Sequence, residues 1–203
     1  MASNDEIVQL AKRAAEKLRI NDTETNPRGI PKAPFIDQVE KFVANADEAE
    51  AMLRMLQSML DKYQSMEAVT LQKKASLNQR VPDIKETLQT VEFLKEQAAK
   101  SKSTVTTYEL DETMHAHAQI DPTDAVCLWL GANVMLEYPI DEAVELLTER
   151  LDAANKNLKD CDEDLEFLRE AITTIQVNTA RVYNWDIQRR KAEKSRPEHE
   201  VVT

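Results

Sequence analysis

Residues 123–138 read TDAVCLWLGANVMLEY. Large apolar and β-branched residues on both sides of Gly131, Ala132 and Asn133 are typical of two short strands joined by a tight turn. Apolar residues follow one another in both strands, so both faces of this hairpin are apolar. Two strands cannot cover themselves, and we therefore expect them to pair with other chains. The residues that we predict to mediate oligomerisation are Val126, Leu128, Trp129, Leu130, Val134, Met135 and Leu136.

Another predicted hairpin lies before residues 123–138 in the chain. A β-branched run at 104–107 is followed by alternation of Met114, Ala116, Ala118 and Ile120 with polar residues, which predicts a half-buried pair of strands. His115 and His117 share the polar face, where imidazoles could hold a metal ion. Cysteine or carboxylate partners at suitable spacing are lacking, so we expect an exposed strand face and no metal.

Heptad patterns flank this compact segment, which spans residues 104–138. The first lies in residues 45–103, has polar residues at Glu67, Thr70 and Lys74 that predict local loosening, and contains Pro82, where we expect a kink or a short break. The second lies in residues 139–195 and is almost uninterrupted from Ile140 to Val182. Two seams of similar length around one short segment predict a long antiparallel coiled-coil hairpin.

The N-terminal region, residues 1–44, differs from the rest. Apolar residues at helical spacing predict a short helix over 3–18, and three prolines in residues 21–34 predict an irregular linker that does not pack. Residues 196–203 form a tail. The predicted fold class is thus mainly α, with a long antiparallel coiled-coil hairpin, two short β-hairpins between the helices, and strands that contribute to an intersubunit β-barrel.

The composition excludes several classes of function. A net charge of −11 disfavours nucleic acid as a partner, and only two glycines argue against a glycine-rich phosphate loop. No apolar run is long enough to cross a membrane, and two cysteines suit free thiols in a cytoplasmic protein. Cys127 is expected on a strand and Cys161 in the seam. No pairing of nucleophile and base and no metal spacing indicates an enzyme, so we expect no catalytic residue and no cofactor.

Three segments carry a family resemblance. The opening stretch, residues 179–190 (TARVYNWDIQRR) and residues 26–36 (NPRGIPKAPFI) resemble the α class of prefoldin subunits, and the likeness extends over residues 26–191. The resemblance implies a heterohexamer of two α-class and four β-class subunits whose strands form a double β-barrel. It also implies binding of unfolded actin and tubulin near the coil tips, and transfer to the cytosolic chaperonin TRiC/CCT without ATP.

Antiparallel pairing of the two helices would place the start of the first beside the end of the second. The apolar tip predicted to bind substrate then comprises Met52, Met55, Met59, Tyr183, Trp185 and Ile187. Methionines adapt to irregular partners, which suits the binding of many unfolded sequences. In the alternative interpretation the methionines only widen the seam and Trp185 caps the coil.

The charge distribution also has two interpretations. Residues 141–170 hold eleven acidic and four basic residues, whereas residues 181–196 hold six basic and two acidic. Cations near a helix C-terminus complement its dipole, and an acidic face keeps a coil soluble. Alternatively, the basic end steers docking on an acidic chaperonin surface, and the association then weakens with added salt.

A different protein class also fits part of the pattern. A coiled-coil tether or scaffold that takes no part in folding accounts for both seams. It leaves the apolar strands of residues 126–136 without a purpose, because a tether dimerises through its helices.

Overall fold

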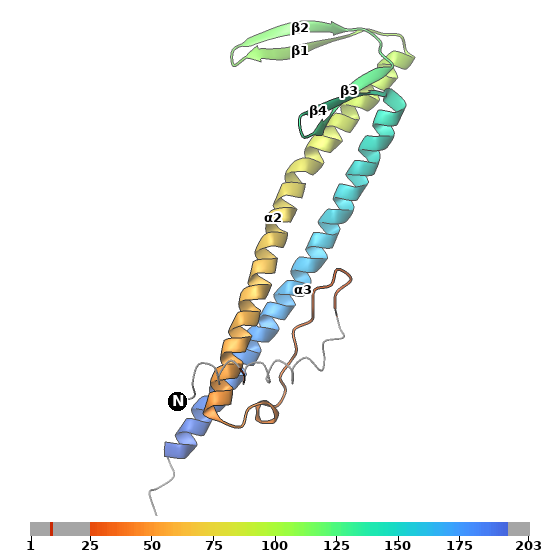
Figure 1. Cartoon of the computed structure of the whole chain (residues 1–203). Coiled ribbons are helices and arrows are strands. Elements are labelled where there is room, and N and C mark those ends of the chain that lie inside the picture. The colour runs from red at the N-terminus through yellow and green to blue at the C-terminus, as the bar shows by residue number, and fades with distance from the viewer. Residues whose placement is uncertain (1–8, 10–24, 195–203) are drawn as a thin grey trace, which may run out of the picture. The chain divides into compact units, whose positions relative to one another are not determined.

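The computed structural model describes residue 9 and residues 25–194. Its elements in chain order are η2 (Val39–Lys41), α2 (Ala46–Ala99), β1 (Thr104–Asp111), β2 (Met114–Ile120), β3 (Ala125–Gly131), β4 (Val134–Pro139) and α3 (Ile140–Lys194) (Figure 1). Two long helices with two antiparallel strand pairs between them confirm the predicted mainly α fold class. The helix predicted over 3–18 and the tail at 196–203 lie outside the residues described in continuous chain.

The chain divides into two compact units. Of the described residues, 25–73 and 161–194 make up the strap unit, and 74–160 make up the strand unit. Both long helices contribute to both units. The prolines of the N-terminal region, the start of α2 and the end of α3 belong to the strap unit, and the two hairpins belong to the strand unit.

Helix α2 begins and ends with local hydrogen bonds. The Glu48 carboxylate accepts a hydrogen bond from the Ala44 N–H at 2.7 Å, which satisfies one donor just ahead of the helix. At the other end Ser101 takes the left-handed conformation with φ 49°, a usual way for a helix to stop. Pro82 lies inside α2 and the helix continues through it, so the alternative of a break is wrong. A proline removes one backbone donor, and the turns on either side keep their own bonds.

Register and turn geometry in the strand unit follow the sequence pattern. Strands β3 and β4 pair Leu128 with Leu136 and Trp129 with Met135. Ala132 and Asn133 both have positive φ, as the mirror-image turn favoured in tight hairpins requires. In β1 and β2, Ala116, Ala118 and Ile120 face one side and His115 and His117 the other, as predicted. Among the described residues, the buried core of this unit consists of Val91, Leu128, Ile140, Ala143 and Leu147.

The strap unit has a separate apolar core at heptad spacing. Leu168, Ile175 and Val182 follow each other at seven-residue steps on α3 and are buried against Leu56 and Tyr63 of α2. An ion pair of 3.6 Å between Arg169 and Glu67 fixes the same antiparallel direction. Residues ahead of α2 complete this core, since Ala33, Ile36, Val39 and Val43 belong to the same cluster.

The proline-containing segment is therefore packed. We call residues 25–43 the strap. The interpretation of residues 21–34 as an unpacked linker is wrong for the described part, because Asn26 and Ala33 within it are only 8% and 7% exposed. Prolines prevented helix formation here, as expected, but an extended chain can still bury alternate side chains against two helices.

Neither long helix in the described part of the chain is apolar over a stretch long enough to cross a membrane. Cys161 is buried in the seam, as its position predicted, and Cys127 is exposed on β3.

Replacement of Ile175 by alanine should lower the free energy of unfolding by about 2–5 kcal/mol, because it leaves a cavity in the core of the strap unit. Urea denaturation followed by far-UV circular dichroism measures the change. Val177→Ala on the exposed side of the same helix is the matched control. Equal effects of the two substitutions would contradict the assigned core.

Candidate functional site

The hairpin of β3 and β4 is apolar on both faces. Val126, Leu128 and Leu130 face the helices of the strand unit and contribute to its core. On the other face Trp129 and Met135 lie directly opposite each other, and they are 58% and 54% exposed. Val134 and Leu136 are exposed as well. All seven residues predicted to mediate oligomerisation thus lie on one hairpin, which can cover only one of its faces with the described part of its own chain.

The hairpin of β1 and β2 is still more exposed. Val105, Tyr108, Leu110, Met114 and Ile120 all present large apolar side chains to solvent, and only Ala116 and Ala118 on β2 are half-buried. The expectation of a half-buried hairpin is therefore wrong for the chain by itself. Together the four strands hold nine of the fifteen large exposed apolar residues of the described chain. Such a concentration of exposed apolar side chains is typical of interaction surfaces.

The six residues predicted to bind substrate lie in the strap unit with unequal accessibility. Met52 is fully buried, whereas Met55, Met59 and Trp185 are partly buried against the same core. Ile187 is half-buried and Tyr183 is 56% exposed. A bound polypeptide could reach Tyr183 directly. It could reach Met52 only after other side chains have moved.

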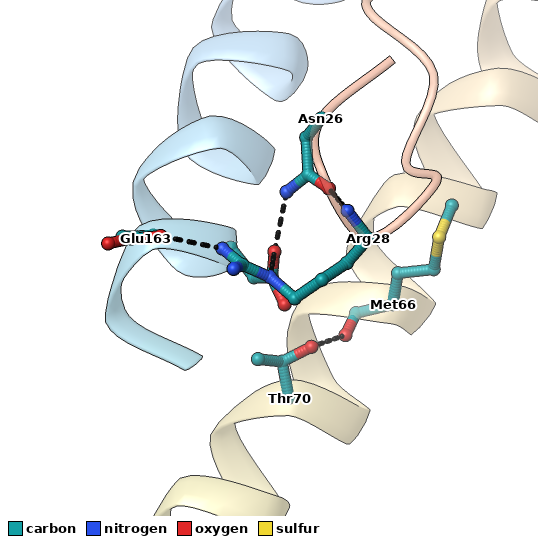
Figure 2. A network of polar contacts seen from close by, with 6 residues as sticks. Asn26, Arg28, Met66, Thr70 and Glu163 are labelled. Carbon is teal, nitrogen blue, oxygen red and sulfur yellow. Dashed lines mark hydrogen bonds and ion pairs between the residues drawn. The ribbon is translucent and has the colours of Figure 1, made fainter. Parts of the chain in front are cut away.

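The strap begins with a turn that is fixed to α3, a feature that the sequence analysis missed. The Asn26 amide Nδ2 donates to Asp164 Oδ1 at 2.5 Å, and Arg28 Nε donates to the same oxygen at 2.6 Å. Arg28 also forms an ion pair of 3.1 Å with Glu163. Figure 2 shows Asn26 and Arg28 reaching from the strap toward the turn of α3 that carries Glu163. We call Asn26, Arg28, Glu163 and Asp164 the latch.

The latch turn has an internal geometry that its sequence explains. The Arg28 N–H donates to Asn26 Oδ1 at 2.6 Å, and the Gly29 N–H donates to the Asn26 carbonyl at 2.9 Å. Gly29 has φ 84°, which L side chains rarely adopt. The run Asn-Pro-Arg-Gly is a turn signal. The sequence could have revealed the turn, but not the distant carboxylates on α3 that it meets.

Beyond the latch, the strap is held through its main chain. Asn178 is fully buried; its Nδ2 donates to the Pro34 carbonyl at 2.7 Å and its Oδ1 accepts from the Ile36 N–H at 3.0 Å. The Tyr63 hydroxyl donates to the Pro31 carbonyl at 3.1 Å. Arg181 donates to the Ile36 and Asp37 carbonyls and lies 4.7 Å from the centre of the Phe35 ring. We call Met52, Tyr63, Ile175, Asn178 and Arg181 the strap site.

The basic end of α3 is partly neutralised within the helix. Asp186 is 4% exposed and forms ion pairs with Arg189 and Arg190. Arg189 also pairs with Glu193. Arg189 and Arg190 are therefore engaged in ion pairs within the helix.

Within the described residues, no group of three or more His, Cys, Asp or Glu side chains has the geometry of a metal site. His115 and His117 are exposed on β2, and His117 Nδ1 lies 3.0 Å from the Thr107 hydroxyl. The candidate site consists of exposed apolar side chains on the strands and of polar side chains that bind the main chain of the strap.

Comparison with known proteins agrees with this picture. Residues 63–185 match the family model described as "Prefoldin subunit". The chain belongs to the prefoldin family. It is 50% identical over 85% of its length to prefoldin subunit 3 of Elsinoe fawcettii, of which it covers 88%. It is 48% identical to the probable prefoldin subunit 3 of Schizosaccharomyces pombe, over 84% of this chain and 98% of that protein, and 44% identical to prefoldin subunit 3 of Homo sapiens, over 82% and 86%.

Membership in the prefoldin family confirms the resemblance seen in the sequence. The chain is a prefoldin chaperone subunit, of a family that is not one of enzymes, and it assembles with other prefoldin subunits. The family match includes both hairpins and most of both helices, but it begins at residue 63, after the strap. The strap therefore needs an explanation of its own.

Tyr63→Phe should lower the free energy of unfolding by about 1 kcal/mol, because the Pro31 carbonyl loses its donor while the buried ring stays in place. Thermal or urea denaturation measures the difference. Tyr183→Phe removes the same hydroxyl from an exposed ring and should change stability by less than about half as much. A larger effect of Tyr183→Phe would contradict the assigned role of Tyr63.

Proposed function

We propose that this chain is an α-class subunit of a hexameric prefoldin, together with one further α-class and four β-class subunits. Both hairpins join the strands of neighbouring subunits into an intersubunit β-barrel. The observation that carries the proposal is the exposed pair of Trp129 and Met135 on the face of β3 and β4 that is turned away from the helices. Closure of a barrel by several chains buries such side chains and pairs the free strand edges at once.

The proposed task of the complex is the capture of unfolded proteins, with actin and tubulin among them, and their transfer to the cytosolic chaperonin TRiC/CCT in the cytoplasm. No step requires ATP. Capture takes place near the coil tips, through Met55, Met59, Tyr183, Trp185 and Ile187, with Met52 beneath them. Met55, Met59 and Trp185 are partly buried against one apolar cluster, which supports this proposal, because flexible thioethers fit many apolar sequences. The cations of residues 181–196 that remain unneutralised steer the encounter with the chaperonin.

Trp129→Glu together with Met135→Glu should prevent assembly. The two carboxylates would lie buried and unpaired in the barrel, at a cost of several kcal/mol. Co-expression with β-class subunits, followed by native mass spectrometry, should show loss of the hexamer mass. Tyr183→Glu, which places the same charge on an exposed apolar position of α3, is the control and should leave the hexamer intact. A hexamer formed by the double variant would overturn the assignment of the interface.

Met59→Ser with Tyr183→Ser should weaken client capture by about threefold to tenfold, since each substitution removes apolar contact area. The measurement is suppression of the aggregation of chemically denatured actin by the assembled complex. Val69→Ser with Leu71→Ser removes apolar area from exposed positions of α2 and is the matched control. Equal capture by the two double variants would favour the alternative in which the methionines only pack the seam.

A further inference from the structure

We propose that the strap site is a binding site for an extended, apolar segment of an unfolded protein, and that the strap occupies this site in cis. A client segment displaces the strap and takes over its contacts. The inference rests on the proposed function, since it presupposes that the complex captures unfolded chains. It goes further by naming the ligand conformation, the side chains that bind it and the occupant that competes with it.

Most polar contacts of the strap site are directed at main-chain atoms; the exception is an ion pair of 3.9 Å between Arg181 and the Asp37 carboxylate. Asn178 binds both a carbonyl and an N–H of the strap, at Pro34 and Ile36, as a neighbouring strand would. Tyr63 binds one carbonyl and Arg181 binds two. An extended polypeptide of any sequence offers a carbonyl and, two residues later, an N–H on the same side, which is the pair that Asn178 binds. These contacts therefore select a conformation rather than a sequence, as a chaperone with diverse clients requires.

Asn178 also restricts which groups can cover the site. Its amide is fully buried within an apolar core, and a buried amide without hydrogen-bond partners costs about 1–3 kcal/mol in proteins. With the strap in place, both ends of the amide are satisfied. A departing strap exposes the amide to water, so a segment that covers it again must supply a carbonyl and an N–H.

The apolar part of the site accepts side chains of several shapes. Ile36, Val39 and Val43 of the strap pack in one cluster with Met52, Leu56 and Ile175. Met55 and Met59 lie against the same cluster. Displacement of the strap would uncover Met52, which is otherwise inaccessible. The methionines predicted from the sequence would thus act together once the strap has left.

The side chains that the strap contributes to the latch are the part that a client cannot reproduce. Asn26 and Arg28 meet Asp164 and Glu163 through their side chains, so these bonds depend on the sequence of the strap. They favour the cis occupant without belonging to the strap site. A weaker latch raises the fraction of molecules whose site is open, and the apparent affinity for a client rises in proportion.

Two substitutions that both loosen the strap should therefore act on capture in opposite directions. Arg28→Ala weakens the latch and should strengthen capture about twofold to fivefold. Asn178→Leu removes the amide that binds the main chain of the bound segment, at similar side-chain volume. It should weaken capture about fivefold or more. Lys41→Ala, at an exposed strap residue outside both latch and site, is the control and should leave capture unchanged. The probe is reduced, carboxymethylated α-lactalbumin, which stays unfolded, binding to the assembled hexamer.

Hydrogen exchange of the wild-type hexamer gives a second measurement that needs no variant. Addition of the probe should accelerate exchange at the Ile36 amide while the amides of β3 and β4 stay unchanged. Probe binding without acceleration at Ile36, or capture that shifts in the same direction in Arg28→Ala and Asn178→Leu, would overturn the inference and leave the proposed function standing. Failure of the wild-type hexamer to bind the probe at all would reject the proposed function, and the inference with it.

Discussion

A hairpin of two strands has two faces and two edges, and the helices that follow it can cover only one face. This constraint governs the strand unit. The face that carries Val126, Leu128 and Leu130 packs into the core of the strand unit. The opposite face, with Trp129 and Met135, is exposed to solvent in the single chain. The proposed interface, in which other subunits complete the sheet, would account for the apolar content of the four strands. The membership in the prefoldin family agrees with that requirement.

Those parts of the molecule that follow a periodic pattern were predictable from the sequence. Heptad spacing identified α2 and α3, because a paired helix must bury an apolar side chain at the same positions of every heptad. Buried side chains at the expected positions of α3 include Leu168, Ile175 and Val182. Alternation in 114–120 gave the faces of β2, and Gly131 with Asn133 gave the turn between β3 and β4. Local rules sufficed for these elements. The continuity of α2 through Pro82 was harder to foresee, because packing along the helix outweighs one missing hydrogen bond.

The strap shows where such reasoning ends. Its hydrogen bonds with α3 join residues that are more than 130 positions apart in the chain, such as Arg28 with Asp164 and Ile36 with Asn178. Nothing in the spacing of a proline-containing segment distinguishes one that packs from one that does not. Asn178 lies one position before Thr179 of the seam and reads as an ordinary polar residue of the helix flank. Only its complete burial, with both ends of the amide occupied by the strap, reveals its role.

The prolines of the strap have a further effect on the behaviour of a protein that exposes much apolar surface. Pro27, Pro31 and Pro34 each lack an amide hydrogen, so the segment cannot offer the unbroken row of donors on which a growing β-aggregate is built. The ring of each proline also fixes one backbone torsion and favours an extended chain before docking. Residues 27–34 thus resemble the residues that protect aggregation-prone segments of other proteins. A strap that has left its helices would still resist cross-β stacking with a second copy.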